Sequence, residues 1–298
     1  MALRYEEKEI KIQNRQETSL EVTGFDGEVS YLHIPEEVGG LPVRSVAAHA
    51  FERRQDLTEV VIPESVRILR AFAFHNCRKL RRVIMTDSVT DVYDGAFRHC
   101  DSLKTVEIRI GAEQYAGIKT ILSDCDATLR LILTFTDGDA VRLTFPSYNH
   151  FYEEDTWARA VHAHIDGSGM AFRECVSRSG IDYAAYDKAF GRACVDGTRA
   201  AAEVALDRLM TPRELSDQAR SQYENYIRHN AAAVLKQLVG GGREEEIRFL
   251  CERAQTLLDH DAVDSVLADA AGAGNPAITA LLMQAGSQLA PADDLFVF

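Results

Sequence analysis

An apolar pattern in the N-terminal part of the chain recurs every 23 residues. Phe51, Phe74 and Phe97 mark this period, and six further columns keep the same step. These columns are Ala50, Ala73 and Ala96; Leu57, Leu80 and Leu103; Val60, Val83 and Val106; Ile62, Met85 and Ile108; Val43, Val66 and Val89; and Val46, Leu69 and Val92. A unit of this size is too small to bury its own apolar face, whereas stacked units bury a continuous core. The period therefore predicts a stack of similar coils.

Each unit contains one short segment with the pattern of a β-strand. The segments span residues 57–63, 80–86 and 103–109, with apolar residues at their first, fourth and sixth positions. Alternation along a strand directs Val60 and Ile62 inward. Parallel strands of neighbouring coils lie ~4.8 Å apart, so that like residues stack. The outward positions are the candidate protein-binding residues: Glu59, Val61, Arg82, Ile84, Thr105 and Glu107.

The repeat unit resembles a known family. The stretch IPESVRILRAFAFHNCRKLRRV, residues 62–83, is similar to the BspA-type leucine-rich repeat, whose unit combines an Ile-Pro, a Val, an Ala-Phe, a Cys, a Leu and a Val. The resemblance covers residues 20–110 and implies a leucine-rich-repeat solenoid. The sequence departs from the unit at Arg54, where later units have Cys77 and Cys100, and at Thr86, where Pro is expected. The resemblance also implies a helical tail, as in some bacterial relatives.

The array is expected to end after a degenerate fourth unit. That unit keeps five apolar positions: Ile121, Leu122, Cys125, Leu129 and Leu131. Residues 127–145 then have the pattern of two strands around Asp137-Gly138, which is a strong hairpin signal. A hairpin at this point would close the open end of the array, as the terminal element of a solenoid must.

From about residue 150 the apolar period becomes helical. Helices are expected over residues 152–164, 170–178, 182–195 and 198–210, and Thr211–Glu214 has the sequence of a capping box that begins another. Later helices are expected to stop at Gly240–Gly242 and to restart at Asn275-Pro276. The stretch DSVLADAAGAGNPAITALLMQAG is similar to an ankyrin-type helix pair, although it lacks the Thr-Pro-Leu-His signature.

These patterns predict an α+β protein with two domains. Residues 1–148 are expected to form a leucine-rich-repeat solenoid of short parallel strands, capped by a β-hairpin. Residues 149–298 are expected to form an all-helical domain, either an all-α bundle or a short α-solenoid.

The charge of the chain limits the partners that are expected. The net charge is −13, and residues 1–110 contain 16 Lys and Arg against 18 Asp and Glu, whereas the remainder contains 17 against 28. An acidic chain is poorly suited to general nucleic-acid binding. No stretch reaches the ~20 apolar residues of a membrane helix, and the charged start lacks the pattern of a secretory signal. We therefore expect a cytoplasmic protein with no nucleic-acid partner and no membrane span.

Two groups of polar residues are candidates for metal ligands. His162 and His164, near Asp166, are two residues apart and do not share a helix face, so that solvated histidines are the favoured interpretation. A group of aspartates lacks the loop spacing of an EF-hand calcium site, and turn chemistry explains part of it: Asp124, Asp126, Asp137 and Asp139. No metal and no cofactor are therefore expected.

The six cysteines form no C-x-x-C pair, which disfavours a zinc or thioredoxin-like site. Stacking brings Cys77, Cys100 and Cys125 within the range of a disulfide. Their favoured interpretation is that of small buried apolar residues. His99 faces Asn76 one coil earlier and is expected to be solvated.

A basic run, Arg78, Lys79, Arg81 and Arg82, has further cations on neighbouring coils: Arg53, Arg54, Arg67, Arg70, Arg98 and Lys104. A solvated face is the favoured interpretation, because the strand pattern alone does not place these side chains together. The alternative is a patch for an acidic partner, including the acidic second half of this chain.

Together these features indicate a non-enzymatic scaffold that binds another protein through its repeats. Mixed charge beside exposed Val and Ile suits a polar-rimmed protein contact at the six outward residues. Two alternatives stay open. The resemblance implies that an exported form would be a surface adhesin that binds host proteins. An enzyme with its site in the helical half is the other, although no residues at catalytic spacing support it.

Overall fold

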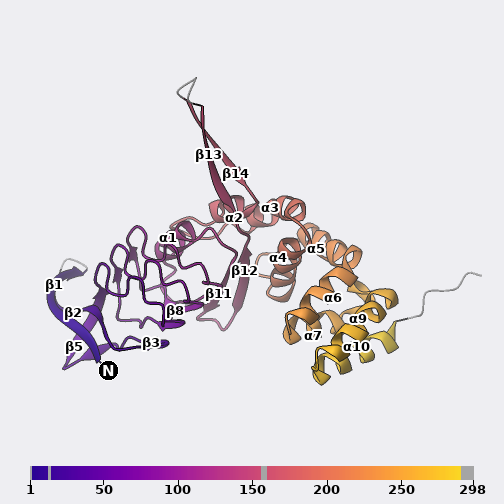
Figure 1. Ribbon diagram of the computed structural model, residues 1–298, viewed down its shortest axis with the longest axis horizontal. Helices are drawn as coiled ribbons and strands as arrows, with labels where there is room; N and C mark the ends of the chain where they lie inside the picture. Colours follow the sequence, from indigo (N-terminus) through magenta and orange to yellow (C-terminus); the bar gives the residue numbers. More distant parts are fainter. Residues whose placement is uncertain (1, 13–14, 156–159, 290–298) are drawn as a thin grey trace, which may run out of the picture. The chain divides into compact units, whose positions relative to one another are not determined.

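Short strands from successive coils pair side by side, as the 23-residue period predicts (Figure 1). The computed structural model describes residues 2–12, 15–155 and 160–289. By their contacts the residues divide into two units, one up to residue 189 and one from residue 190. The predicted domain boundary between residues 148 and 149 stays a prediction.

The first unit contains two six-stranded sheets. Sheet 2 has the order β12-β11-β10-β8-β6-β3, and its strands are parallel except for β12. Its strands are β3 (Tyr31–His33), β6 (Glu59–Val61), β8 (Arg82–Thr86), β10 (Thr105–Ile110), β11 (Leu129–Phe135) and β12 (Ala140–Phe145). The antiparallel β11–β12 pair is the predicted terminal hairpin, and β11 joins it to the repeat strands through β10. The predicted cap is thus confirmed.

Sheet 1 begins with an N-terminal hairpin that the sequence patterns did not predict. Its order is β1-β2-β5-β7-β9, and β4 pairs with β5. The strands are β1 (Ala2–Ile12), β2 (Arg15–Asp26), β4 (Glu37–Val38), β5 (Leu41–Val46), β7 (Ile68–Leu69) and β9 (Asp91–Val92). Because β1 and β2 are antiparallel and β2 is parallel to β5, the hairpin adds two strands before the first full coil.

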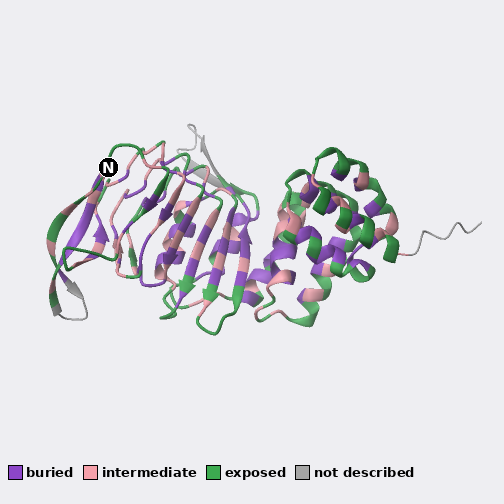
Figure 2. Ribbon diagram, turned by 90° about the horizontal axis from the view of Figure 1, so that it is seen from below, coloured by how far each residue is buried: buried purple, intermediate pink, exposed green. Residues whose placement is uncertain are grey.

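The repeated apolar columns form the core, as predicted. Phe51, Phe74 and Phe97 are at most 1% exposed and stack with ring centroids 5.1 and 5.3 Å apart. Figure 2 shows buried residues alternating with half-buried and exposed ones along the strands. Burial of each such side chain contributes about 1.5–3 kcal/mol, and parallel ring pairs add about 0.5–1.5 kcal/mol.

Backbone hydrogen bonds also join the turns of neighbouring coils. The Phe51 amide donates to the Ala73 carbonyl at 2.8 Å, and one coil later the Phe74 amide donates to Ala96 at 2.9 Å. Each turn contains two left-handed positions, and these recur at the same period: His49, Phe72 and Gly95 in one column, and Arg53, Asn76 and His99 in the other. At Gly95 a Cβ atom would lie 2.5 Å from the Phe72 ring, which explains glycine there.

A carboxylate replaces the missing coil where this turn ladder ends. The last repeat turn has no following turn to accept from its amides. Instead the Asp124 side chain, at the end of α1 (Ala116–Asp124), accepts from Gly95 N at 3.1 Å and from Phe97 N at 3.0 Å. Burial raises the pKa of Asp124 above its ordinary value, although both amide hydrogen bonds act in the opposite direction.

A buried arginine satisfies the carbonyls at the same end. Arg173, on α2 (Gly169–Glu174), is 3% exposed and donates to five backbone carbonyls at 2.5–3.1 Å. These acceptors are Leu122, Cys125, Ala127, Pro146 and Gly169. Its guanidinium also lies 4.8 Å from the centroid of the Tyr148 ring. Five fixed N–H donors suit guanidinium to this task better than any other side chain.

Helices form the rest of the described chain. They are α3 (Tyr183–Asp196), α4 (Thr198–Met210), α5 (Asp217–His229), α6 (Ala231–Gly240), α7 (Glu244–Glu252), α8 (Ala254–Leu257), α9 (His260–Gly272) and α10 (Pro276–Gln288). Within the second unit α9 contacts α6 and α10 contacts α7. Gly242 and Gly274, 32 residues apart, turn the two helix pairs with φ of 62° and 69°. This stacking is that of a short α-solenoid, one of the two predicted forms. Among the described residues, no helix has the length and apolar content to cross a membrane.

Two helix predictions were wrong. Residues 152–164 were expected to be helical and the domain from residue 149 all-helical, but β13 (Asn149–Asp155) and β14 (Ala160–Asp166) form an antiparallel hairpin. The capping box at Thr211–Glu214 does not begin a helix. Instead the Thr211 hydroxyl donates back to Asp207 O at 2.8 Å, and α5 begins at Asp217 after a Ser216 cap.

We expect Arg173→Met to destabilise the first unit. Methionine keeps an apolar stem but leaves five carbonyls without this donor, so that the free energy of unfolding should fall by about 2–4 kcal/mol in urea denaturation. The control is Arg178→Met at an exposed site, where a change within about 0.5 kcal/mol is expected. Equal losses in both variants would contradict the assigned role.

The stability contribution of Asp124 should depend on pH. Because its folded pKa is raised, the folded chain holds this proton more tightly than the unfolded chain does. Relative to Asp124→Asn, the wild type should therefore be most stable below the ordinary pKa of Asp, and should lose that advantage as pH rises through the folded pKa of Asp124. Urea unfolding of both proteins over this pH range measures the difference, and an advantage that grows with pH would refute the expectation.

Candidate protein-binding face

The structure brings the six predicted residues together on β6, β8 and β10. One row, paired in register, contains Glu59, Arg82 and Thr105. The next row contains Val61, Ile84 and Glu107. All six are half-buried, because alternate residues of the same strands fill the core. Their role in binding a protein stays a prediction.

Arg82 lies at the centre of the face and bridges two carboxylates. Its Nε and Nη2 donate to the two oxygens of Glu107 at 2.7 and 2.8 Å, and its Nη1 donates to Glu59 at 3.2 Å. The hydrogen bond from Glu107 is the main cause that raises the pKa of Arg82. The three side chains therefore form one fixed, polar cluster that crosses three coils.

The sheet carries further outward residues that the sequence patterns did not single out. Tyr31 and His33 on β3 pair with Glu59 and Val61, and Ile132 on β11 pairs with Glu107. Tyr31 is 55% exposed. We call the outer face of sheet 2 the set Tyr31, His33, Glu59, Val61, Arg82, Ile84, Thr105, Glu107 and Ile132. The 23-residue register, extended by one strand in each direction, would have found the added residues.

The predicted basic run does not form one patch, because most of its cations have separate partners. Arg54 pairs with Asp56, Arg70 with Glu21 and Arg98 with Asp94. Arg54 also donates to Phe25 O and Gly27 O, where Cys77 and Cys100 of later coils donate to Phe51 O and Phe74 O. The departure from the repeat at position 54 is thus explained by its contact with the N-terminal strands.

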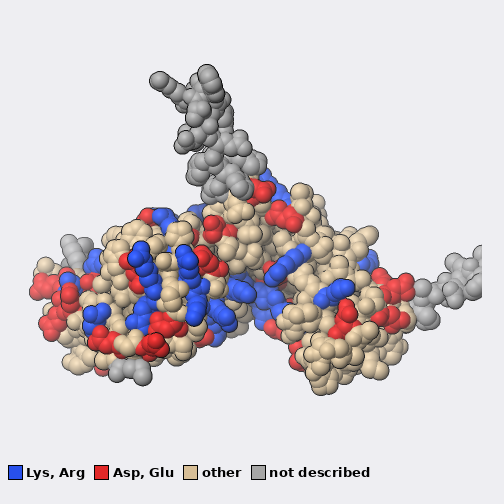
Figure 3. All heavy atoms as spheres, in the orientation of Figure 1, with Lys and Arg blue, Asp and Glu red and all other residues tan. Residues whose placement is uncertain are grey.

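Three cations of the run differ from the others. Lys79, Arg81 and Lys104 are exposed, and no acidic side chain of the described residues lies within ion-pair distance of them. Figure 3 shows Lys and Arg side chains gathered over the coils of the first unit.

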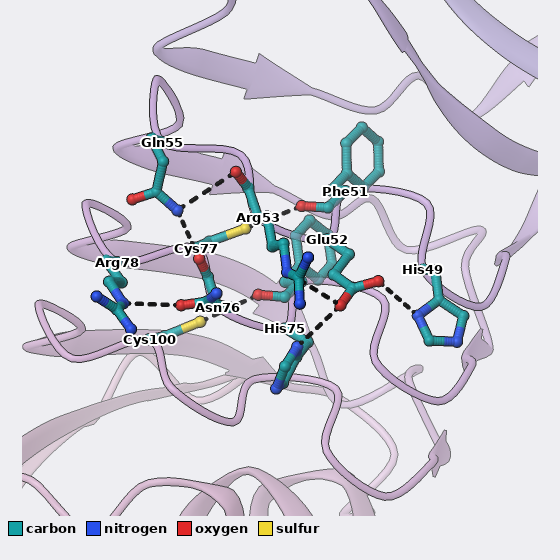
Figure 4. Close-up of polar contacts among 11 residues, drawn as sticks. His49, Phe51, Glu52, Arg53, Gln55, His75, Asn76, Cys77, Arg78 and Cys100 are labelled. Atoms are coloured by element: carbon teal, nitrogen blue, oxygen red, sulfur yellow. Dashed lines mark hydrogen bonds and ion pairs between the residues drawn. The ribbon is translucent and has the colours of Figure 1, made fainter.

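A second polar cluster lies on the turns. Glu52 accepts from His49 Nδ1 at 2.8 Å through one oxygen and contacts His75 Nδ1 at 3.3 Å through the other (Figure 4). The hydrogen bond with His49 is the main cause that lowers the pKa of Glu52. His99 is exposed, as predicted, and its ring lies 5.4 Å from that of His75. Among the described residues, no three His, Cys, Asp or Glu side chains are placed to hold a metal ion.

The stacked cysteines have structural roles. Cys77, Cys100 and Cys125 are free and buried, as predicted, and the Cys77 thiol donates to Phe51 O at 3.0 Å (Figure 4). Burial raises the pKa of Cys77 to about 12, so that it stays a thiol and is a poor nucleophile.

The other predicted candidates are dispersed over different elements. Asp137 and Asp139 lie in the β11–β12 turn, where Asp137 accepts from the Asp139 amide at 2.9 Å, whereas Asp124 accepts from the repeat turn. His162 and His164 lie on β14 rather than on a helix, and their side chains are outside the described residues. Gly240–Gly242 ends α6, as predicted.

Comparison with known proteins agrees with the repeat register. A family model described as the BspA type leucine rich repeat region matches residues 29–125 in six copies. No curated protein matches the chain.

Several solved structures are similar to parts of the chain. A leucine-rich repeat protein from Bacteroides capillosus is 26% identical over 35% of this chain and 83% of its own length, with a TM-score of 0.29. One from Bacteroides ovatus is 25% identical over 45% of this chain and 37% of its own, with a TM-score of 0.32. A leucine rich cell surface protein from Faecalibacterium prausnitzii is 20% identical over 46% of this chain and 44% of its own, with a TM-score of 0.27. With the repeat model and the 23-residue ladder, residues 29–125 are a BspA-type leucine-rich repeat region, and a helical region follows it in the chain.

Proposed function

We propose that this protein is a non-enzymatic scaffold that binds a protein partner through the outer face of sheet 2. The observation that carries the proposal is the regular face itself. Val61 and Ile84 lie side by side, half-exposed, next to the fixed cluster of Arg82 and its two carboxylates. An apolar centre with a satisfied polar rim is the composition of a protein interface.

The helices of the first unit leave this part of the sheet accessible. The helix α1 packs on β9 of sheet 1, and α2 packs on the terminal strand β12. The side chains of the middle strands keep part of their surface in solvent. Leucine-rich repeat regions generally bind other molecules, which supports the proposal without naming the partner.

The described chemistry favours binding over catalysis. The thiols are buried, and the Glu52 carboxylate is held between two imidazoles on exposed turns rather than in an enclosed pocket. The compartment of the protein, and the adhesin role of an exported form, stay predictions from the sequence.

We expect the double variant Arg82→Ala with Ile84→Ala to lose partner capture while staying folded. Truncation at the centre of an interface commonly costs more than about 2 kcal/mol, which lowers affinity more than about tenfold. Half-exposed ion pairs contribute only about 0–1 kcal/mol to folding, so that the urea midpoint should move little. The measurement is quantitative mass spectrometry of proteins captured from the source cell by the full chain and by the variant.

Arg67→Ala with Ile68→Ala is the matched control. Both residues are half-buried, and Ile68 lies on β7 of sheet 1. The control should retain the partner. Retention by the sheet-2 variant, or equal loss in both variants, would show that the binding site lies elsewhere.

A further inference from the structure

Like charges recur at the repeat period in one column beside the outer face of sheet 2. Arg81 and Lys104 precede β8 and β10, and the Lys104 amide donates to the Arg81 carbonyl at 3.0 Å. Their backbones are therefore neighbours, at the ~4.8 Å spacing of adjacent strands. Lys79, two residues before Arg81, adds a third exposed cation.

Other charged columns of the coils are compensated. Arg82 has Glu59 and Glu107 on its two sides, and Arg78 lies 3.8 Å from Asp101 of the next coil. The like-charged column of Arg44 and Arg67 donates to the Ser65 and Ser88 carbonyls instead, and Arg44 also pairs with Glu17. The pair Arg81 and Lys104 lacks such an ion pair, and the whole chain is acidic, with a net charge of −13.

We propose that the outer face of sheet 2 takes an extended acidic segment of a protein partner. Carboxylates of the segment pair with Lys79, Arg81 and Lys104, and an apolar side chain of the same segment lies on Val61 and Ile84. This inference rests on the proposed function, and it adds the chemistry of the partner.

The spacing of the two contacts fits an extended chain. Arg81 and Ile84 are three residues apart along one strand, which corresponds to about 10 Å. A partner segment that runs along β8 would therefore carry its acidic and apolar side chains about three residues apart. The cluster of Arg82 with Glu59 and Glu107, which lies between the two contacts, is already satisfied and forms part of the polar rim.

Charge distinguishes a protein segment from a nucleic acid as the occupant. A nucleic acid presents a continuous row of phosphates, and affinity for it grows with the number of phosphates contacted. Here three cations without ion pairs stand next to two carboxylates, Glu59 and Glu107. Such a face suits a few separated carboxylates better than a phosphate backbone.

Selection from a random-peptide library displayed on yeast tests the proposal with the full chain as bait. Selected peptides are then synthesised with fluorescein and measured by fluorescence polarisation. We expect enrichment of Asp and Glu about three residues from an apolar residue, and affinities that fall as NaCl is raised. Arg81→Glu with Lys104→Glu should weaken these peptides about tenfold or more. The matched control, Arg178→Glu with Lys188→Glu, makes the same charge change at exposed sites after the repeats and should bind as the wild type does.

The outcomes separate the inference from the proposed function. Peptides without acidic bias that bind the Arg81 and Lys104 variant normally, but lose affinity for Arg82→Ala with Ile84→Ala, would overturn the acidic partner and keep the binding face. No enriched peptide, or peptides insensitive to both variants, would overturn both. A fluorescein-labelled single-stranded oligonucleotide that binds more tightly than the selected peptides would overturn the inference in favour of a nucleic acid.

Discussion

The hydrogen bonds between successive coils are the constraint on which the rest of the first unit depends. A strand or turn of one coil leaves amides and carbonyls that only the next coil satisfies, as the Phe51 amide and the Ala73 carbonyl show. The array therefore cannot simply stop, because the last buried groups would lack partners. Charged side chains replace the missing coil at its ends. Asp124 accepts from two amides, and Arg173 donates to five carbonyls.

The same logic applies at the start of the array. Arg54 occupies the column of Cys77 and Cys100, but its longer side chain reaches the carbonyls of Phe25 and Gly27. Its partner Asp56 accepts from the Val29 amide at 2.6 Å. A thiol suffices between two identical coils, whereas a guanidinium is needed where a coil meets a strand pair of different geometry. Departures from the repeat pattern thus mark the places where the repeat ends.

The repeat columns were predictable because each one combines a period with burial. The inward and outward sides of β6, β8 and β10 follow from alternation, and so did the six candidate residues. The capping contacts were not predictable in this way. Arg173 is 48 residues from Cys125 in sequence, and no periodic pattern connects them. The hairpins β1–β2 and β13–β14 were missed because their residues follow no period of 23, and Thr211 was misread because its hydroxyl has an alternative acceptor in Asp207 O.

Stacking of like positions also constrains where charge can lie. In a ladder every residue has its counterpart about one strand spacing away, so that any charge repeated at the period faces a like charge. Most columns avoid this by alternating sign or type, as Glu59, Arg82 and Thr105 do, or Glu52, His75 and Arg98. Core residues fix the ladder and cannot vary, so that recognition is confined to the outward columns. Within those columns, a charge that its neighbours compensate contributes to the scaffold. A charge that they do not compensate keeps its field for a molecule in solution.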